Sequence, residues 1–190
     1  DAPRKKLIAI DAKGPAKANW KTLISECADV IDSIDIVGGK FVVKSMHDAA
    51  SRLAVYAQDG KALGTITLPG LGSVGSISGR EDENEFFYNF TSFARPTTNF
   101  RHDVATNKGG VFQAPKGAFL PDDYETKQVF YASKDGTRVP MFITHKRGVK
   151  LDGGTPTILY GYGGFDISLT PSFSVSMLSW MEAGGIFAQP

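Results

Sequence analysis

Short apolar runs separated by turns recur along the first two thirds of the chain. Leu7–Ile10 resembles Leu53–Ala57, which lies 46 residues later, and Asn99–Val104 follows about 46 residues after that. Apolar and polar positions alternate in Leu53–Tyr56 and again in Thr65–Leu68, and this alternation indicates half-buried strands. A period near 45 residues, with three or four strands in each unit, is typical of β-propeller blades.

Neighbouring runs complete each repeat. Phe41–Val43 and Glu85–Tyr88 precede two of the runs, and Asp59-Gly60 predicts a tight hairpin because both residues tolerate a positive φ. The aromatic stretch Phe86–Phe93 is expected in the core, and Arg80–Asn84 is expected as a solvated turn. A further short strand is predicted after each run: Trp20–Ile24, Gly64–Leu68 and Val111–Ala114. A β-sandwich with fortuitous spacing is the alternative, and the repeat favours the propeller.

The pattern changes after a polar, turn-rich connector at Gly117–Glu125. Gln128–Lys134 and Arg138–His145 flank the turn Asp135-Gly136 and predict a hairpin. Pro140 has no amide hydrogen to donate, so the second strand is expected at a sheet edge or with that position facing outward.

A helix is predicted between two apolar runs near the end of the chain. Thr157–Tyr160 is a continuous apolar run, which is typical of a strand buried on both faces. The helix is expected over Ser172–Glu182, with Ser172 or Ser174 as its N-cap and Gly184-Gly185 as its end. Ile186–Ala188 begins another strand.

This order of elements predicts two parts. Residues 1–120 are expected to form propeller blades, and residues 121–190 are expected to form the opening of an α/β domain. Because the chain begins with Asp1 and stops inside an apolar run, it is interpreted as a segment of a longer protein.

Composition narrows the classes of function. The 190 residues are 42% hydrophobic and 22% charged, and 21 basic against 20 acidic residues leave a net charge of +1. Without a basic stripe, strong electrostatic binding of nucleic acid is not expected. The single cysteine, Cys27, excludes an intramolecular disulfide and a multi-cysteine metal site. No run approaches the roughly 20 apolar residues of a transmembrane helix.

The loop Gly161-Tyr162-Gly163-Gly164 carries the candidate chemistry. A dinucleotide fingerprint would need a third glycine where the chain has Asp166, and a phosphate-binding loop would need Gly-Lys-Ser/Thr. A third hypothesis is an oxyanion loop, in which the Tyr162 hydroxyl donates to a developing negative charge. A purely structural turn stays open as the alternative.

The sequence resembles the prolyl oligopeptidases, a family of serine peptidases. Tyr160–Phe165, continuing to Pro171, is similar to the start of the family's catalytic domain, and Ser133–Phe142 is similar to the hairpin before it. Thr91–Phe93 with Pro96 resembles the last propeller blade. The resemblance implies a seven-bladed propeller that caps an α/β-hydrolase domain. It also implies cleavage of short peptides on the carboxyl side of proline, without a metal or an organic cofactor.

The resemblance also implies roles for two residues. Tyr162 matches the hydroxyl of the oxyanion hole, and Phe165 matches the aromatic wall of the pocket for the substrate proline. The chain contains no Gly-x-Ser-x-Gly, so the Ser, Asp and His triad is expected outside these residues, and the segment alone is not expected to hydrolyse peptides. The three histidines match no catalytic position and are expected at the surface or in turns: His47, His102 and His145. Cys27 matches no nucleophile motif.

Three alternatives stay open. An oligopeptidase B-like enzyme, which cleaves after basic residues, has Ser-Tyr where this chain has Gly164-Phe165. An acylaminoacyl-type peptidase shares the architecture, and a propeller without catalytic function could serve as an interaction module. The resemblance further implies a monomer in the cytoplasm, with a periplasmic or secreted location left open, and partners that include neither nucleic acid nor membrane.

Overall fold

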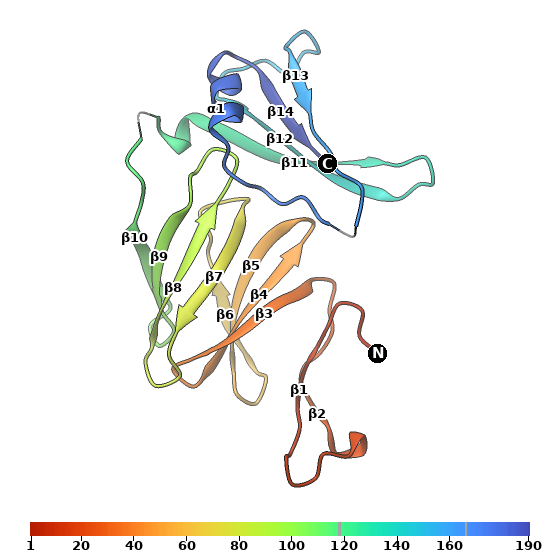
Figure 1. Cartoon of the computed structure of the whole chain (residues 1–190), viewed down its shortest axis with the longest axis vertical. Coiled ribbons are helices and arrows are strands. Elements are labelled where there is room, and N and C mark those ends of the chain that lie inside the picture. The colour runs from red at the N-terminus through yellow and green to blue at the C-terminus, as the bar shows by residue number, and fades with distance from the viewer. Residues whose placement is uncertain (118, 166) are drawn as a thin grey trace. The chain divides into compact units, whose positions relative to one another are not determined.

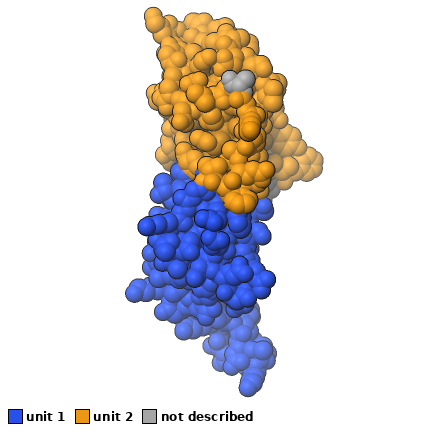
Figure 2. Space-filling view, turned by 90° about the vertical axis from the view of Figure 1, so that its left-hand side faces the viewer, with its two compact units in different colours: residues 1–68, 76–88, 100–110 blue, residues 69–75, 89–99, 111–190 orange. Residues whose placement is uncertain are grey.

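The computed structural model describes residues 1–117, 119–165 and 167–190. The chain forms two compact units (Figure 2). Unit 1 comprises residues 1–68, 76–88 and 100–110, and unit 2 comprises residues 69–75, 89–99 and 111–190. Because each unit combines separate segments, this division does not test the predicted boundary between residues 120 and 121, which stays a prediction.

The first complete sheet is an antiparallel meander of four strands (Figure 1). Its strands are β3 (Val30–Val37), β4 (Lys40–His47), β5 (Ala50–Ala57) and β6 (Ala62–Ile66). They pair in sequence order, as the strands of a propeller blade do.

A second four-stranded sheet repeats this order. It contains β7 (Ser73–Gly79), β8 (Glu85–Thr91), β9 (Thr98–Asp103) and β10 (Lys108–Gln113). A two-stranded sheet of β1 (Leu7–Ala9) and β2 (Lys21–Ile24) precedes both, with a 3₁₀ turn at Lys17–Asn19 between its strands. The runs that repeat every 46 residues fall on β1, β5 and β9. In both complete sheets this is the third strand, so the repeat is confirmed.

The sequence patterns missed the first strand of each complete sheet, β3 and β7. In β3 the register shifts between Ile31 and Ser33, and this irregularity breaks the two-residue alternation. In β7 small residues are required: a Cβ at Gly79 would stand 2.7 Å from Phe86 Cβ and from Val37 Cγ2. A strand of Gly and Ser carries little hydrophobic signal, and so it resembles a loop in the sequence.

The aromatic residues of β8 lie mostly in the core, as predicted, but they alternate between core and surface along the strand. Phe86, Tyr88 and Phe90 are buried, whereas Phe87 is 36% exposed. The ring of Tyr88 stacks on that of Phe100 at a centroid distance of 5.2 Å. The turn before β8 is exposed and is held by an ion pair of Arg80 with Asp82, which confirms a solvated turn.

Unit 2 contains a mixed sheet with the strand order β11-β12-β14-β13 (Figure 1). The strands are β11 (Tyr124–Ala132), β12 (Arg138–Lys146), β13 (Thr157–Leu159) and β14 (Ile186–Gln189), and a 3₁₀ turn at Pro121–Asp123 leads into β11. β11 and β12 form the predicted antiparallel hairpin over their whole length.

Pro140 lies where β12 has only one neighbouring strand. β12 pairs with β14 only from Phe142 to His145, so its first half is an edge although its second half is central. The edge prediction therefore holds for the part of the strand that contains Pro140.

The helix α1 (Val175–Glu182) connects β13 to β14, which run parallel. Ser174 caps the helix and accepts a hydrogen bond from the Met177 amide. At the other end Gly184 takes a positive φ of 90°, and the Gly185 amide donates to the Trp180 carbonyl. Both ends were predicted from the sequence.

A hydrogen-bonded group anchors α1 to the hairpin. Tyr124 on β11 donates its hydroxyl to Glu182 Oε1, and Lys146 on β12 donates to Glu182 Oε2 at 2.8 Å. Burial and the Glu182 carboxylate raise the pKa of Tyr124 above its ordinary range, so this hydroxyl stays protonated as a donor. In the described residues no helix has the length and apolar character that crossing a membrane requires.

Two predictions about burial were wrong. β13 is the last strand of its sheet rather than a strand covered on both faces, and its Leu159 is 68% exposed. His102 and His145 are buried rather than at the surface, because each occupies an inward position of a strand. Cys27 is free and exposed.

Candidate functional site

The glycine loop leaves the C-terminal end of β13. The Tyr160 amide donates to the Ala188 carbonyl at 2.9 Å, so the pairing of β13 with β14 continues to the start of the loop. A turn then closes through the Ile167 amide and the Gly164 carbonyl, 3.2 Å apart. The loop is thus tied to the sheet at its start and contains a hydrogen-bonded turn. Asp166, which the sequence analysis used to reject a dinucleotide fingerprint, lies outside the described residues.

Tyr162 presents its hydroxyl from this loop. The side chain is 48% exposed. A Cβ at Gly164 would stand 3.7 Å from the Tyr162 hydroxyl oxygen, so the glycine leaves that flank of the phenol open. A phenol can donate a hydrogen bond to an oxyanion, and the loop leaves this one accessible to a ligand.

Phe165 occupies an unusual backbone conformation on the same loop. Its φ is +57°, which residues other than glycine rarely adopt, and its side chain is 91% exposed. Such strain costs about 1–3 kcal/mol and persists where the surrounding structure or a function requires it. The structure therefore brings Tyr162 and Phe165 to one loop and leaves both side chains accessible.

His145, which the sequence analysis rejected as a catalytic group, is buried on β12. Its Nδ1 lies 3.0 Å from the Lys146 carbonyl and donates to it, and its Nε2 has no partner within the described residues. No group of three or more His, Cys, Asp or Glu side chains that could hold a metal ion occurs among the residues that the structure places.

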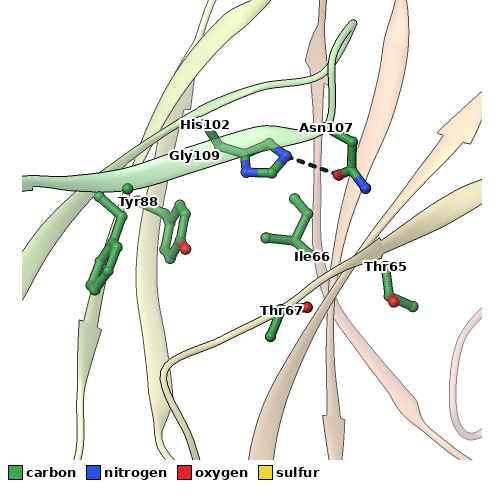
Figure 3. A pocket seen from close by; sticks show the side chains of 9 residues that line it. Thr65, Ile66, Thr67, Tyr88, His102, Asn107 and Gly109 are labelled. Atoms are coloured by element: carbon green, nitrogen blue, oxygen red, sulfur yellow. Dashed lines mark hydrogen bonds between the residues drawn. The ribbon is translucent and has the colours of Figure 1, made fainter.

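A second candidate site is a cavity of about 270 Å³ in unit 1 (Figure 3). Thr65 and Thr67, at the end of β6, lie on one side of it, and Tyr88 and His102 lie on the other. His102 Nε2 lies 3.1 Å from Asn107 Oδ1, which closes the turn between β9 and β10.

The two ionisable side chains that line this cavity, His102 and Tyr88, favour their neutral forms. Burial lowers the pKa of His102, although Asn107 and the nearby Asp103 act in the opposite direction. Burial also raises the pKa of Tyr88. None of the described residues that line the cavity carries a charged side chain. The cavity can offer hydroxyl and ring nitrogen atoms to a small neutral molecule, but it has no nucleophile activated by a base.

Two polar residues that line cavities, Asn107 and Gln189, were not among the candidates from the sequence. Gln189 ends the otherwise apolar strand β14, and Asn107 precedes β10 with a positive φ of 54°. For Gln189 the sequence did contain a signal, because this polar residue ends an otherwise apolar run. No signal in the sequence paired Asn107 with His102, because the pairing depends on the shape of the turn.

Comparisons with known proteins agree with the order of these elements. Residues 1–115 match the family model described as "Prolyl oligopeptidase, N-terminal beta-propeller domain". The chain is similar to a prolyl endopeptidase of Elizabethkingia meningoseptica, with 43% identity over all 190 residues. It is also similar to a prolyl oligopeptidase A of Galerina marginata, with 34% identity over the whole chain.

Solved structures show the same similarity. One, from work on two prolyl endopeptidases, covers 99% of this chain with a TM-score of 0.90 and 40% identity. Prolyl oligopeptidase B from Galerina marginata without ligand covers the whole chain with a TM-score of 0.88 and 31% identity. The chain spans only 27% of the Elizabethkingia relative and 28% of these two structures.

Proposed function

Because this chain belongs to the prolyl oligopeptidase family, through its N-terminal β-propeller domain, we propose that it carries the last propeller blades and the opening of an α/β-hydrolase domain. Residues 1–120 form the propeller part in this proposal, and residues 121–190 begin the catalytic domain. The similarity to prolyl endopeptidases over the whole chain supports it. The parallel connection from β13 through α1 to β14 also supports it, since such units build α/β domains.

The parent protein is a serine peptidase that cleaves short peptides on the carboxyl side of proline. It forms an acyl-enzyme with a serine supplied by a part of the protein outside these 190 residues, as do its aspartate and histidine. The propeller restricts entry to short peptides. The reaction is acyl transfer and needs no organic cofactor. A cytoplasmic monomer that binds neither nucleic acid nor membrane stays a prediction.

Tyr162 stabilises the tetrahedral intermediate in this proposal. The observation that carries the proposal is the accessible phenol of Tyr162, which follows a parallel strand directly and has glycines on both sides. A donor fixed before the reaction stabilises the developing oxyanion without any cost of reorganisation.

Phe165 holds the proline ring of the substrate. Its side chain is 91% exposed, and its backbone has a positive φ of 57°. Proline presents a compact apolar ring, and the face of an aromatic side chain is a suitable partner for it.

Replacing Tyr162→Phe in the full-length protein should lower kcat by about 10²–10³ on a proline-containing peptide, because one oxyanion donor is lost. KM should change little, since the hydrogen bond forms mainly in the transition state. Steady-state kinetics measure both constants. Tyr131→Phe is the matched control: Tyr131 is 44% exposed on β11, away from the loop.

An unchanged kcat in the Tyr162→Phe variant would remove Tyr162 from the mechanism. A parent protein that cleaves after arginine but not after proline would contradict the proposed specificity and favour the oligopeptidase B type. A parent protein without any peptidase activity would support the interaction module instead.

Replacing Phe165→Ala should reduce kcat/KM for proline-containing peptides by roughly tenfold or more, as the loss of an apolar contact in a specificity pocket does. The reduction should be smaller for the matching peptide with alanine in place of proline. Kinetics with the two peptides measure this ratio. Phe112→Ala is the control, because Phe112 is an exposed phenylalanine on β10. An equal loss for both peptides would assign Phe165 to the fold of the loop.

A further inference from the structure

A cavity of about 240 Å³ lies in unit 2 at the base of the glycine loop. Ile158 on β13 and Phe187 and Gln189 on β14 line one side of it. Met177 on α1 and the helix cap Ser174 line another. Neither Tyr162 nor Phe165 is among the residues that line this cavity.

The place of this cavity in the fold is one where α/β proteins bind ligands. β13 and β14 run parallel, so their C-terminal ends lie at the same edge of the sheet. Tyr160 follows the end of β13, and Gln189 is the last residue of β14; both line the cavity. Ser174, the N-cap of α1, lines the same cavity, so the N-terminus of the helix adds partial positive charge there.

Gln189 provides an independent sign of a ligand. It is 5% exposed, and its Nε2 has no hydrogen-bond partner within the described residues. The other residues of β14 are apolar and buried, so a methionine or leucine would fill this position at lower cost. A buried amide group without a partner is destabilising, and native proteins tolerate few such groups.

The remaining walls restrict the chemistry of the ligand. Phe93 and Phe187 meet edge to face at a centroid distance of 5.6 Å and provide an aromatic surface. No charged side chain is among the residues described as lining the cavity. An ionised ligand would therefore lose its hydration without gaining an opposite charge. Ser172 stands at the rim, where it is exposed and its hydroxyl can bind a second polar atom.

We propose that this cavity binds a neutral carboxamide attached to an aromatic or apolar body. The carbonyl oxygen accepts from Gln189 Nε2, whose terminal amide turns about a soft torsion toward the cavity. The amide N–H donates to the Ser172 hydroxyl, and the apolar body lies against Phe93, Phe187 and Met177.

Fluorine NMR of the full-length protein with 4-fluorobenzamide tests the proposal. The wild-type protein should broaden the ligand signal in a saturable manner. Gln189→Met keeps the side-chain volume but removes the donor, and should weaken binding about threefold to tenfold. Ser172→Trp should block the rim and abolish binding. Gln113→Met, on the exposed end of β10, is the matched control and should bind as the wild type does.

Two further measurements separate recognition from structure. Binding of 4-fluorotoluene, which has no amide, should be equal in the wild type and in Gln189→Met. The Tm of Gln189→Met should equal or exceed that of the wild type, because the variant removes an unpaired buried amide. A lower Tm with unchanged 4-fluorobenzamide binding would make Gln189 a structural residue and overturn the proposal. Absence of saturable binding of the amide to the wild type would also overturn it.

A blocked amino acid, N-acetyl-4-fluorophenylalaninamide, identifies the source of the carboxamide. Binding of this probe in preference to 4-fluorobenzamide supports a site for a peptide residue. The reverse preference supports a site for a free aromatic amide. Either preference supports the proposal only if Gln189→Met reduces the binding of the preferred probe.

Discussion

His102 is a titratable ring in the interior that hydrogen-bonds to Asn107. It is 5% exposed, and its Nε2 lies 3.1 Å from Asn107 Oδ1. Burial is the largest influence on its pKa and lowers it from the ordinary value of 6.5. The folded protein therefore favours the neutral ring, whereas the unfolded chain takes up a proton near pH 6.5.

The sign of the resulting pH dependence follows from proton uptake. The unfolded state binds more protons than the folded state below about pH 6.5, so the stabilising contribution of neutral His102 is lost as the pH falls through the folded pKa. Denaturant unfolding between pH 7 and pH 5 should show a smaller loss of stability for His102→Gln than for the wild type. An NMR titration of the His102 ring with a midpoint at or above 6.5 would contradict this prediction.

At the scale of elements, two hairpins use the same turn in different surroundings. Asp59-Gly60 joins β5 to β6, and Asp135-Gly136 joins β11 to β12. The two glycines have φ values of +90° and +84°. In each turn the aspartate accepts a hydrogen bond from the backbone amide two residues later. A Cβ at Gly60 would stand 1.9 Å from the Leu23 carbonyl oxygen, whereas a Cβ at Gly136 would meet nothing within 4 Å.

Alanine substitutions at these two glycines separate the cost of backbone strain from the cost of a steric clash. Gly136→Ala should cost about 1 kcal/mol of stability, the cost of a left-handed conformation in a residue other than glycine. Gly60→Ala should cost about 1–3 kcal/mol more, because the backbone at Leu23 has to move. Denaturant unfolding of both variants measures the difference. Equal costs would show that β2 does not hold this turn closely.

At the scale of the molecule, consecutive sheets are joined through the turns at their ends. The amides of Gly38 and Gly39, between β3 and β4, donate to the carbonyls of Arg80 and Glu81 at 3.2 and 3.1 Å. Val37 and Phe86 are both 0% exposed. The close approach at Gly79 places these two side chains beside each other. The first two complete sheets therefore share part of a core within unit 1.

Replacing Phe86→Ala should cost about 3–5 kcal/mol, the usual cost of deleting a buried phenylalanine. Because Phe86 lies beside Val37, hydrogen exchange should become faster in β3 as well as in β8. Phe87→Ala, one residue along β8, should cost less than about 1 kcal/mol, since Phe87 is 36% exposed. Faster exchange confined to β8 would show that the two sheets unfold independently.

Local patterns were enough to predict most elements of unit 1 and the ends of α1. β1, β5 and β9 followed from their repeat, and the hairpins followed from Asp-Gly pairs. β3 escaped prediction because a bulge breaks its alternation, and β7 escaped because close packing requires small residues there. In each case a contact with a neighbouring strand or side chain decided the structure.

The candidate site also contains some residues that the sequence could indicate and others that it could not. Tyr162 could be singled out from the sequence because glycines around an aromatic residue form a local motif, whereas Phe165 was singled out only through the resemblance to the prolyl oligopeptidases. The structure shows that both side chains are accessible. Their catalytic roles stay predictions. The cavity at Gln189 could not be found from the sequence, since it is formed by residues that the chain brings together from β13, β14 and α1.

The sequence alone determined the blade-like repeat, the hairpin turns, the caps of α1 and the family to which the chain belongs. These features depend on the periodicity of side chains and on the backbone preferences of glycine, aspartate and serine, which act over a few residues. Only the tertiary structure decided that Leu159 is exposed, that His102 is buried and that Gln189 faces a cavity. Burial depends on which distant strands cover a residue, and the residue's own neighbours in sequence do not carry that information.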